Sequence, residues 1–144
     1  ITMRRNLTPD DLGDLLELPI LAILATHAED GQILLSPVWH EWRDRGFSII
    51  TWAKDIKSRQ LNANPKATVV VAEQFRPYRS IEVRGRAELS QPPDRYEILR
   101  RIACRYLGDD AGASYAEDYA GIEIELIRIV PGYIRAWDFS DQDA

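Results

Sequence analysis

The sequence of 144 residues contains little cysteine and little histidine, and these shortages exclude several kinds of site. Cys104 is the single cysteine, so no disulfide can form within the chain, which suits a reducing cytoplasm. His27 and His40 are the only histidines, and with one cysteine they cannot make a zinc site of the usual Cys/His spacing. We therefore expect a cytoplasmic protein without a structural metal.

Long apolar runs are also missing from the sequence, and we expect no secretory leader. No apolar run approaches the ~20 residues that a membrane-spanning helix needs. The first residues, ITMRRNLTPDD, lack the apolar core of a signal peptide. A chain of this length can bury one core. We expect a single domain over residues 1–144 without a membrane partner, in which residues 1–7 and 139–144 are flexible.

Positive charge is scarce overall but concentrated in one segment. The formal net charge is −5, yet residues 54–86 contain eight cations against three anions. A local positive field in an acidic molecule attracts a small anion better than it attracts a nucleic acid duplex. We expect no nucleic-acid partner. A barrel that binds single strands in a basic, aromatic groove is the alternative, and the net acidity argues against it.

Alternating apolar and polar residues predict a fold dominated by β-strands. The expected strands span residues 20–27, 33–42, 47–52, 67–73, 80–89, 122–130 and 133–137. Expected helices span residues 8–18 and 95–108, and residues 109–121 form either a short acidic helix or a loop. Many short strands with short connections predict a closed antiparallel barrel with helices on its outside.

Four local features are predicted along these strands. Asp30–Gly31 is the expected tip of a hairpin, and Pro37 indicates an edge position or a bulge. The alternation slips near Ile127, which predicts a bulge there. Pro131–Gly132 predicts a turn before the last strand.

The basic segment begins with TWAKDIKSRQLNANPKA, residues 51–67. If Asp55 opens a helix, Lys57 and Ser58 fall in its first turn, where backbone N–H groups, a hydroxyl and an ammonium can converge on an anion. A lysine at the positive end of a helix dipole is unfavourable unless an anion binds. The spacing supports equally a solvated helix whose cations face water.

Aromatic residues gather around the stretch SPVWHEW. Trp39 and Trp42 suit stacking on a ring system, although packing in a core or a dimer is the commoner role of a tryptophan. His40 lies on the opposite strand face from Trp39 and is either a proton donor or, as is commoner for a lone histidine, a residue that sits at the surface or satisfies a hydrogen bond. Cys104 lies within a helix, where a buried structural thiol is expected. Since no nucleophile motif is present, any catalysis is expected to use a bound cofactor, and no catalytic residue is assigned.

The order of several segments resembles a known superfamily. These segments are LAILATHAEDG, SPVWHEW, TWAKDIKSRQLNANPKATVVV, YRSIEVRGRAEL, RYLG and GYIRAWDF. Together they are similar to the pyridoxamine 5′-phosphate oxidase-like split β-barrel proteins, and within them to the group described as F420-dependent enzymes. The resemblance covers nearly the whole chain. It implies a mainly β fold, a split antiparallel β-barrel of the FMN-binding type, and a homodimer with two cofactor sites between its subunits.

The resemblance also implies roles for particular residues. Thr51 and Lys57, with Ser58 beside them, are expected to hold the cofactor phosphate. Some relatives carry an arginine where this chain has Asp55, and Lys54 is the expected substitute. The other implied contacts are those of Pro37, Val38 and Trp39 with the cofactor ring, of Tyr78 and Arg79 with the partner's cofactor, and of Trp137, which closes the pocket.

The implied function is that of an oxidoreductase acting on a small organic substrate. F420 is the expected cofactor, because the extra cations Arg76 and Arg79 suit its long anionic tail. FMN is the alternative within the same fold. A carrier that binds a flavin or deazaflavin without catalysis is the alternative from another class.

Overall fold

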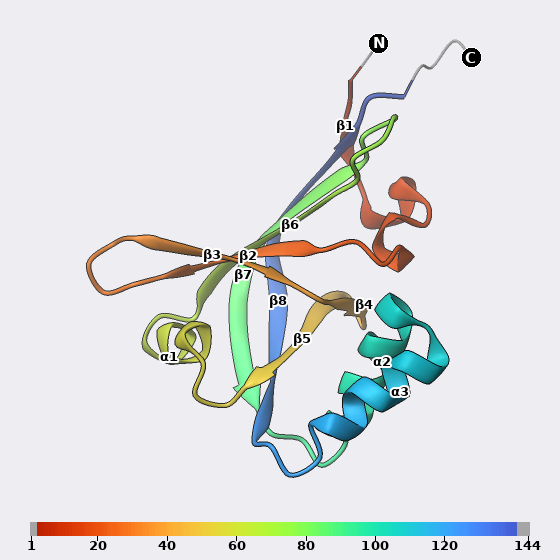
Figure 1. The fold of residues 1–144 in the computed structure, drawn as a ribbon. Helices are drawn as coiled ribbons and strands as arrows, with labels where there is room; N and C mark the ends of the chain where they lie inside the picture. Colours follow the sequence, from red (N-terminus) through yellow and green to blue (C-terminus); the bar gives the residue numbers. More distant parts are fainter. Residues whose placement is uncertain (1–2, 141–144) are drawn as a thin grey trace.

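The computed structural model describes residues 3–140, which form a strongly curved β-sheet with helices at its margins (Figure 1). In chain order the elements are β1 (Arg4–Leu7), the 3₁₀ helices η1 (Pro9–Leu12) and η2 (Leu15–Glu17), β2 (Ala22–His27), β3 (Ile33–Val38), β4 (Glu41–Arg43), β5 (Gly46–Trp52), α1 (Ile56–Ala63), β6 (Lys66–Ala72), β7 (Ser80–Ser90), α2 (Arg95–Leu107), α3 (Asp109–Asp118) and β8 (Ile124–Asp138). None of the helices within residues 3–140 has the length and apolar character to cross a membrane.

The sheet is antiparallel throughout, with the strand order β3-β2-β6-β7-β8-β5-β4, and β1 pairs with β8. Its two end strands, β3 and β4, follow each other in the chain and are joined through Trp39 and His40. Within residues 3–140 no ladder pairs β3 with β4, so the barrel is split rather than closed. The predicted mainly β, split-barrel fold is confirmed, and the expectation of a closed barrel is corrected.

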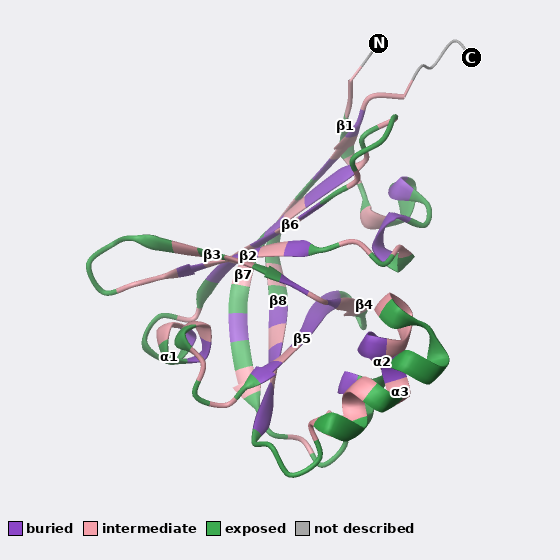
Figure 2. Ribbon diagram, viewed as in Figure 1, coloured by how far each residue is buried: buried purple, intermediate pink, exposed green. Residues whose placement is uncertain are grey.

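The core lies on the concave side of this sheet. Strands β6, β7 and β8 largely alternate buried and less buried residues, as Figure 2 shows along β7 and β8, because successive side chains point to opposite faces. Phe47, Val69, Ile81 and Ile129 are among the fully buried side chains. Burial of such side chains contributes roughly 1.5–3 kcal/mol each, which makes this core the main stabilising element of the fold.

The N-terminal segment differs from its prediction in two ways. The expected helix at 8–18 is divided into η1 and η2, because Gly13 between them has φ 62°, a left-handed conformation that ends a helix. Residues 4–7, expected to be flexible, form β1, whose Arg4 pairs with Asp138 of β8. Of the expected C-terminal flexible segment, residues 141–144 lie outside the described range.

Strand β8 also differs, since it is one strand where two strands and a turn were predicted. Its irregularity lies at Gly132, because Arg84 pairs with Tyr133 while Gly85 pairs with Pro131. The strands approach so closely there that a Cβ on Gly85 would lie 2.0 Å from the Val130 carbonyl oxygen. Ile127 pairs without interruption, so the bulge predicted there is wrong. A bulge can accommodate a proline within a strand, which explains why Pro131 makes no turn.

Helices α2 and α3 lie side by side at the open edge of the sheet (Figure 1). Segment 109–121, left open between helix and loop, contains helix α3. A Cβ on Gly112 would lie 2.4 Å from the Cys104 Cα atom, so glycine is required where the two helices cross. Cys104 is half-buried at this crossing rather than fully buried as expected. The helix pair forms one wall of the site described next.

Candidate functional site

Two adjoining pockets, of about 280 and 260 Å³, lie between the β5–α1 segment and the α2–α3 pair. We call them together the groove. The residues that line both pockets are Ile50, Lys57, Leu99 and Tyr115. The first pocket is also lined by Thr51, Trp52, Asp55 and Tyr119, and the second by Pro37, Val38 and Trp39. The structure thus brings five of the predicted site residues together: Pro37, Val38, Trp39, Thr51 and Lys57.

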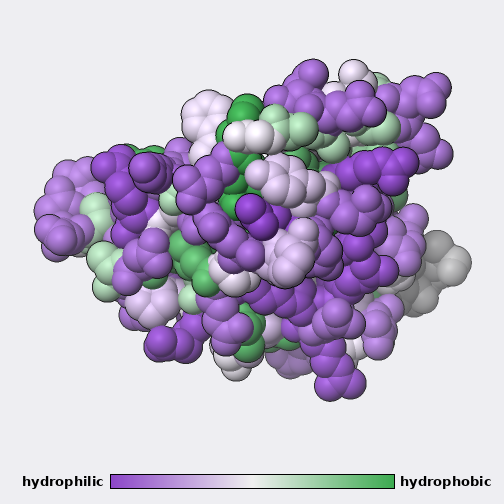
Figure 3. Space-filling model, turned by 90° about the horizontal axis from the view of Figure 1, so that it is seen from below, coloured by the Kyte–Doolittle hydropathy of each residue, from purple (hydrophilic) through white to green (hydrophobic). Residues whose placement is uncertain are grey.

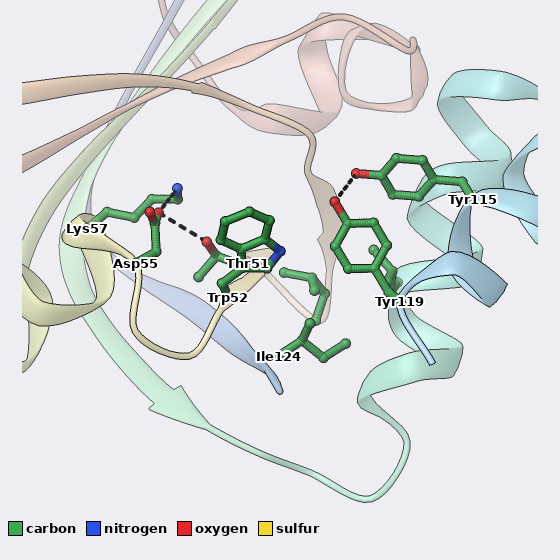
Figure 4. A pocket seen from close by; sticks show the side chains of 9 residues that line it. Thr51, Trp52, Asp55, Lys57, Tyr115, Tyr119 and Ile124 are labelled. Atoms are coloured by element: carbon green, nitrogen blue, oxygen red, sulfur yellow. Dashed lines mark hydrogen bonds and ion pairs between the residues drawn. The ribbon is translucent and has the colours of Figure 1, made fainter. Parts of the chain in front are cut away.

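Lys57 reaches the groove from the first turn of α1. Asp55 is the N-cap of this helix with extended backbone angles, so the helix begins where the sequence predicted. The Asp55 carboxylate accepts a hydrogen bond from Thr51 Oγ1 at 3.2 Å and one from Lys57 Nζ (Figure 4). Burial acts to raise the pKa of Asp55, but these bonds and the lysine charge outweigh it and hold that pKa below its ordinary value. Asp55 is therefore a carboxylate at neutral pH.

Ser58 and Lys54, also predicted to contact the phosphate, lie elsewhere. Ser58 is fully buried, and its hydroxyl donates to the Trp52 carbonyl oxygen at 3.3 Å. This bond fixes the bend between β5 and α1. Lys54 is exposed and lines neither pocket of the groove.

An aromatic wall closes the side of the groove opposite Lys57. Trp39 stacks on Tyr106 of α2, with ring centres 5.0 Å apart and an angle of 8° between the ring planes. The ring centres of Trp39 and Tyr115 of α3 are also 5.0 Å apart. The hydroxyls of Tyr115 and Tyr119 lie 3.1 Å apart (Figure 4). Burial, reinforced by this bond, raises the pKa of Tyr115 to about 12, so its hydroxyl stays protonated at neutral pH. Trp39 is thus held in place by both helices.

Tyr115 and Tyr119 were not predicted as site residues. They are four positions apart, which places them on one face of a helix. That spacing was the available signal in the sequence. It could not be used while the segment was undecided between helix and loop.

His40 is a core residue and does not face the groove. Its ring is fully buried against Phe47, with ring centres 5.3 Å apart. Its backbone N–H donates to the Tyr106 hydroxyl, and its carbonyl oxygen accepts from Arg105. Burial, and then the charge of Arg105, lowers the pKa of His40 to about 3. The ring is therefore neutral at ordinary pH, which removes it as the proton donor.

Tyr78, Arg79 and Trp137 lie at what we call the hairpin end, formed by residues 73–79 and the adjoining parts of η1, β1 and β8. In Figure 1 this end lies beside the two ends of the described chain, away from α2 and α3. Tyr78 is exposed, and Arg135 lies over the Trp137 ring at 4.4 Å. None of the three residues lines the groove. Their predicted contact with a partner subunit's cofactor stays a prediction.

The groove combines surfaces that suit a planar ring carrying an anionic tail. Ile50 and Leu99 supply apolar surface, Trp39 supplies an aromatic wall, and Lys57 with Thr51 supplies an ammonium and a hydroxyl. Among residues 3–140 no group of three or more His, Cys, Asp or Glu side chains is placed to hold a metal ion. The donor set therefore fits a flavin or a deazaflavin.

Several solved structures have the same fold. The conserved hypothetical protein Rv2991 from Mycobacterium tuberculosis is 22% identical, with a TM-score of 0.75, over 96% of this chain and 95% of its own. An F420 reductase is 26% identical, with a TM-score of 0.70, over 88% of this chain and 98% of its own. A FAD-binding protein from Mesorhizobium loti is 22% identical, with a TM-score of 0.68, over 97% and 98% of the two chains.

The sequence comparison identifies the family. No curated protein matches the chain. A family model described as pyridoxamine 5′-phosphate oxidase, however, matches residues 8–138. This match covers nearly the whole sequence and confirms the resemblance. The chain therefore belongs to the pyridoxamine 5′-phosphate oxidase family, whose members are mostly oxidoreductases.

Proposed function

We propose that the protein is an F420-dependent oxidoreductase that reduces a small unsaturated organic substrate. The observation that carries this proposal is the groove, in which Lys57 and Thr51 lie at one side and Pro37, Val38 and Trp39 at the other. If Lys57 and Thr51 bind the cofactor phosphate, the attached ring would lie along the aromatic wall. The single cysteine suits the proposed cytoplasmic location.

The choice of F420 has one further support, the 26% identity to an F420 reductase over 88% of this chain. FMN has the same kind of tricyclic core and also carries a phosphate, so the groove could hold either molecule. FMN is therefore the second candidate. A direct comparison of the two affinities decides between them.

The residues of the groove would bind and orient the cofactor. Reduced F420, when bound, would supply the hydride and be oxidised to F420. Lys57 and Thr51 would hold its phosphate, and Trp39 would fix the plane of the ring. The α2–α3 wall, with Leu99 and Tyr115, would exclude water from one side. The Tyr115–Tyr119 hydroxyls are polar groups within hydrogen-bonding reach of a ligand in the first pocket.

We further propose that the protein is a homodimer whose interface includes the exposed face of β3. Ile33 and Leu35 on this face are 58% and 63% exposed, and β3 is an end strand of the sheet. An apolar end strand invites association. Pro37 continues the same face and lines the groove, so a second copy would complete the groove's rim. The face seen in Figure 3 is mostly hydrophilic, with apolar side chains in small areas.

The dimer is tested by light scattering of the purified protein. We expect twice the chain mass of 16.5 kDa for the wild type and for Leu107→Glu, which places the same charge on an exposed leucine of α2. Leu35→Glu should give the mass of one chain. A wild-type protein with the mass of a single chain at tens of micromolar concentration overturns the proposal.

The cofactor assignment is tested by titrating the protein with F420 and with FMN while following tryptophan fluorescence. We expect micromolar or tighter binding of F420. Lys57→Ala should weaken it about 10- to 100-fold, because a charge-assisted contact to phosphate contributes ~1.5–3 kcal/mol. Lys54→Ala removes the same charge from an exposed side chain, three residues earlier in the sequence. It should change the affinity less than about twofold.

Each alternative has its own outcome in this titration. Tighter binding of FMN and a yellow preparation with flavin fluorescence would replace F420 by FMN. Tight binding without turnover of any acceptor would make the protein a carrier. Binding of neither cofactor, or an unchanged affinity in a folded Lys57→Ala variant, would overturn the proposed site.

A further inference from the structure

The groove already contains an internal anion at the position proposed for the cofactor phosphate. The Asp55 carboxylate accepts from Thr51 Oγ1 at 3.2 Å and from Lys57 Nζ, the two groups proposed to hold that phosphate. The side chains of Lys57 and Asp55 are 17% and 27% exposed, so the pair lies in the groove wall and not in open solvent. Figure 4 shows all three side chains converging on one point.

The orientation of Asp55 is not explained by helix capping. An aspartate at an N-cap usually accepts a hydrogen bond from the backbone of the first helical turn. In the described part of the chain, the Asp55 side chain makes no cap hydrogen bond to the second or third residue of α1, and its backbone contact is with the adjacent Ile56. The carboxylate turns toward Lys57 and Thr51 instead. Its negative charge therefore lies in the lining of the groove.

This carboxylate makes the charged lining of the groove neutral. Lys57 and Asp55 are the charged residues that line the two pockets, and their charges cancel. A phosphate that reaches Lys57 therefore also meets Asp55. Because Coulomb repulsion is proportional to charge, a group with two negative charges is repelled twice as strongly as a group with one.

We propose that Asp55 is a specificity-determining residue that favours a cofactor with a singly charged phosphodiester over one ending in a doubly charged phosphomonoester. This inference rests on the proposed function. The phosphate of F420 is a diester with one negative charge. The terminal phosphate of FMN carries nearly two charges at pH 7, since its second pKa is about 6. Asp55 thereby discriminates between two molecules whose ring systems are alike.

The test compares wild type with Asp55→Asn by equilibrium titration at pH 7, with F420, FMN and riboflavin as the three probes. Partly exposed charge pairs have modest energies, so we expect about threefold tighter binding for each negative charge on the phosphate that meets residue 55. F420 should therefore bind about threefold tighter to the variant and FMN about tenfold tighter. Riboflavin, which has no phosphate, should bind unchanged. Asp55→Ser, which retains a good N-cap residue, should give the same pattern.

Asp110→Asn is the matched control, because Asp110 is an exposed aspartate of α3 outside the groove lining. It should leave all three affinities within about 1.5-fold. If wild type binds neither F420 nor FMN, the proposed function fails, and this inference fails with it. If wild type binds F420 but folded Asp55→Asn and Asp55→Ser shift F420 and FMN by the same factor, the inference alone is overturned.

Discussion

Two regions of the molecule hold cations beside carboxylates, yet the surroundings of these cations differ. At the hairpin end, Arg79 donates hydrogen bonds to both carboxylate oxygens of Glu73, to Asp14 and to the Leu12 carbonyl oxygen. In the groove, Lys57 has one carboxylate partner, Asp55, and lines both pockets. Arg79 is occupied by structural contacts, whereas Lys57 faces space that a ligand can enter. The partners of a cation therefore indicate its role better than its charge does.

The hairpin end also ties the two ends of the described chain together. Arg4 of β1 donates from Nε to Asp138 Oδ1 at 2.8 Å and makes a second contact to Oδ2. The Asp138 side chain is only 2% exposed. Such a bidentate pair favours one geometry. We therefore assign the hairpin end to stability and the groove to binding, and two predictions test this division.

The largest expected effect is on Arg79. Arg79→Ala would leave the Glu73 side chain, 10% exposed, without its guanidinium, so we expect a loss of about 3 kcal/mol in the free energy of unfolding. Urea denaturation at a fixed protein concentration measures this loss. Affinity for F420 should stay within about twofold of the wild type.

Arg76→Ala is the control for that experiment, because it removes an exposed arginine of the same connection. It should change the free energy of unfolding by at most about 0.5 kcal/mol. A weakened F420 affinity in Arg79→Ala with unchanged stability would reverse the assignment of the two regions. It would also support the predicted contact of Arg79 with a partner's cofactor.

A smaller effect is expected from acid. The hydrogen bonds from Arg4 lower the pKa of Asp138 from an ordinary 3.8 to about 2. A carboxylate whose pKa is lower in the folded than in the unfolded protein stabilises the fold at pH values above the unfolded pKa. This stabilisation is lost as the pH falls through the folded pKa. Between pH 5 and pH 2 the wild type should therefore lose about 2 kcal/mol more than Asp138→Asn. Parallel losses in the two proteins would contradict the role of this pair.

Local patterns were sufficient to predict most of the strands, and the family resemblance named five residues that the structure brings together in the groove. Alternation along residues 80–89 predicted strand β7, and the cap at Asp55 placed Lys57 correctly in the first turn of α1. The gathering of Thr51, Lys57 and Trp39 at one groove followed from a resemblance that covered nearly the whole chain. These features depend on neighbouring residues or on the order of segments.

Features that depend on distant partners could not be predicted. Strand β1 has the polar sequence RRNL, and its pairing with β8 determines its conformation. The bulge at Gly132 exists because β7 approaches there through Gly85. The ion pair of Arg79 with Asp14 joins residues that are 65 positions apart in the sequence.

A crystal structure of the protein soaked with F420 tests the central claim most directly. We predict that the phosphate lies within about 4 Å of Lys57 Nζ, the distance of an ion pair, with the ring along Trp39. A phosphate bound at the hairpin end beside Arg79, with Lys57 still on Asp55 alone, would contradict the account.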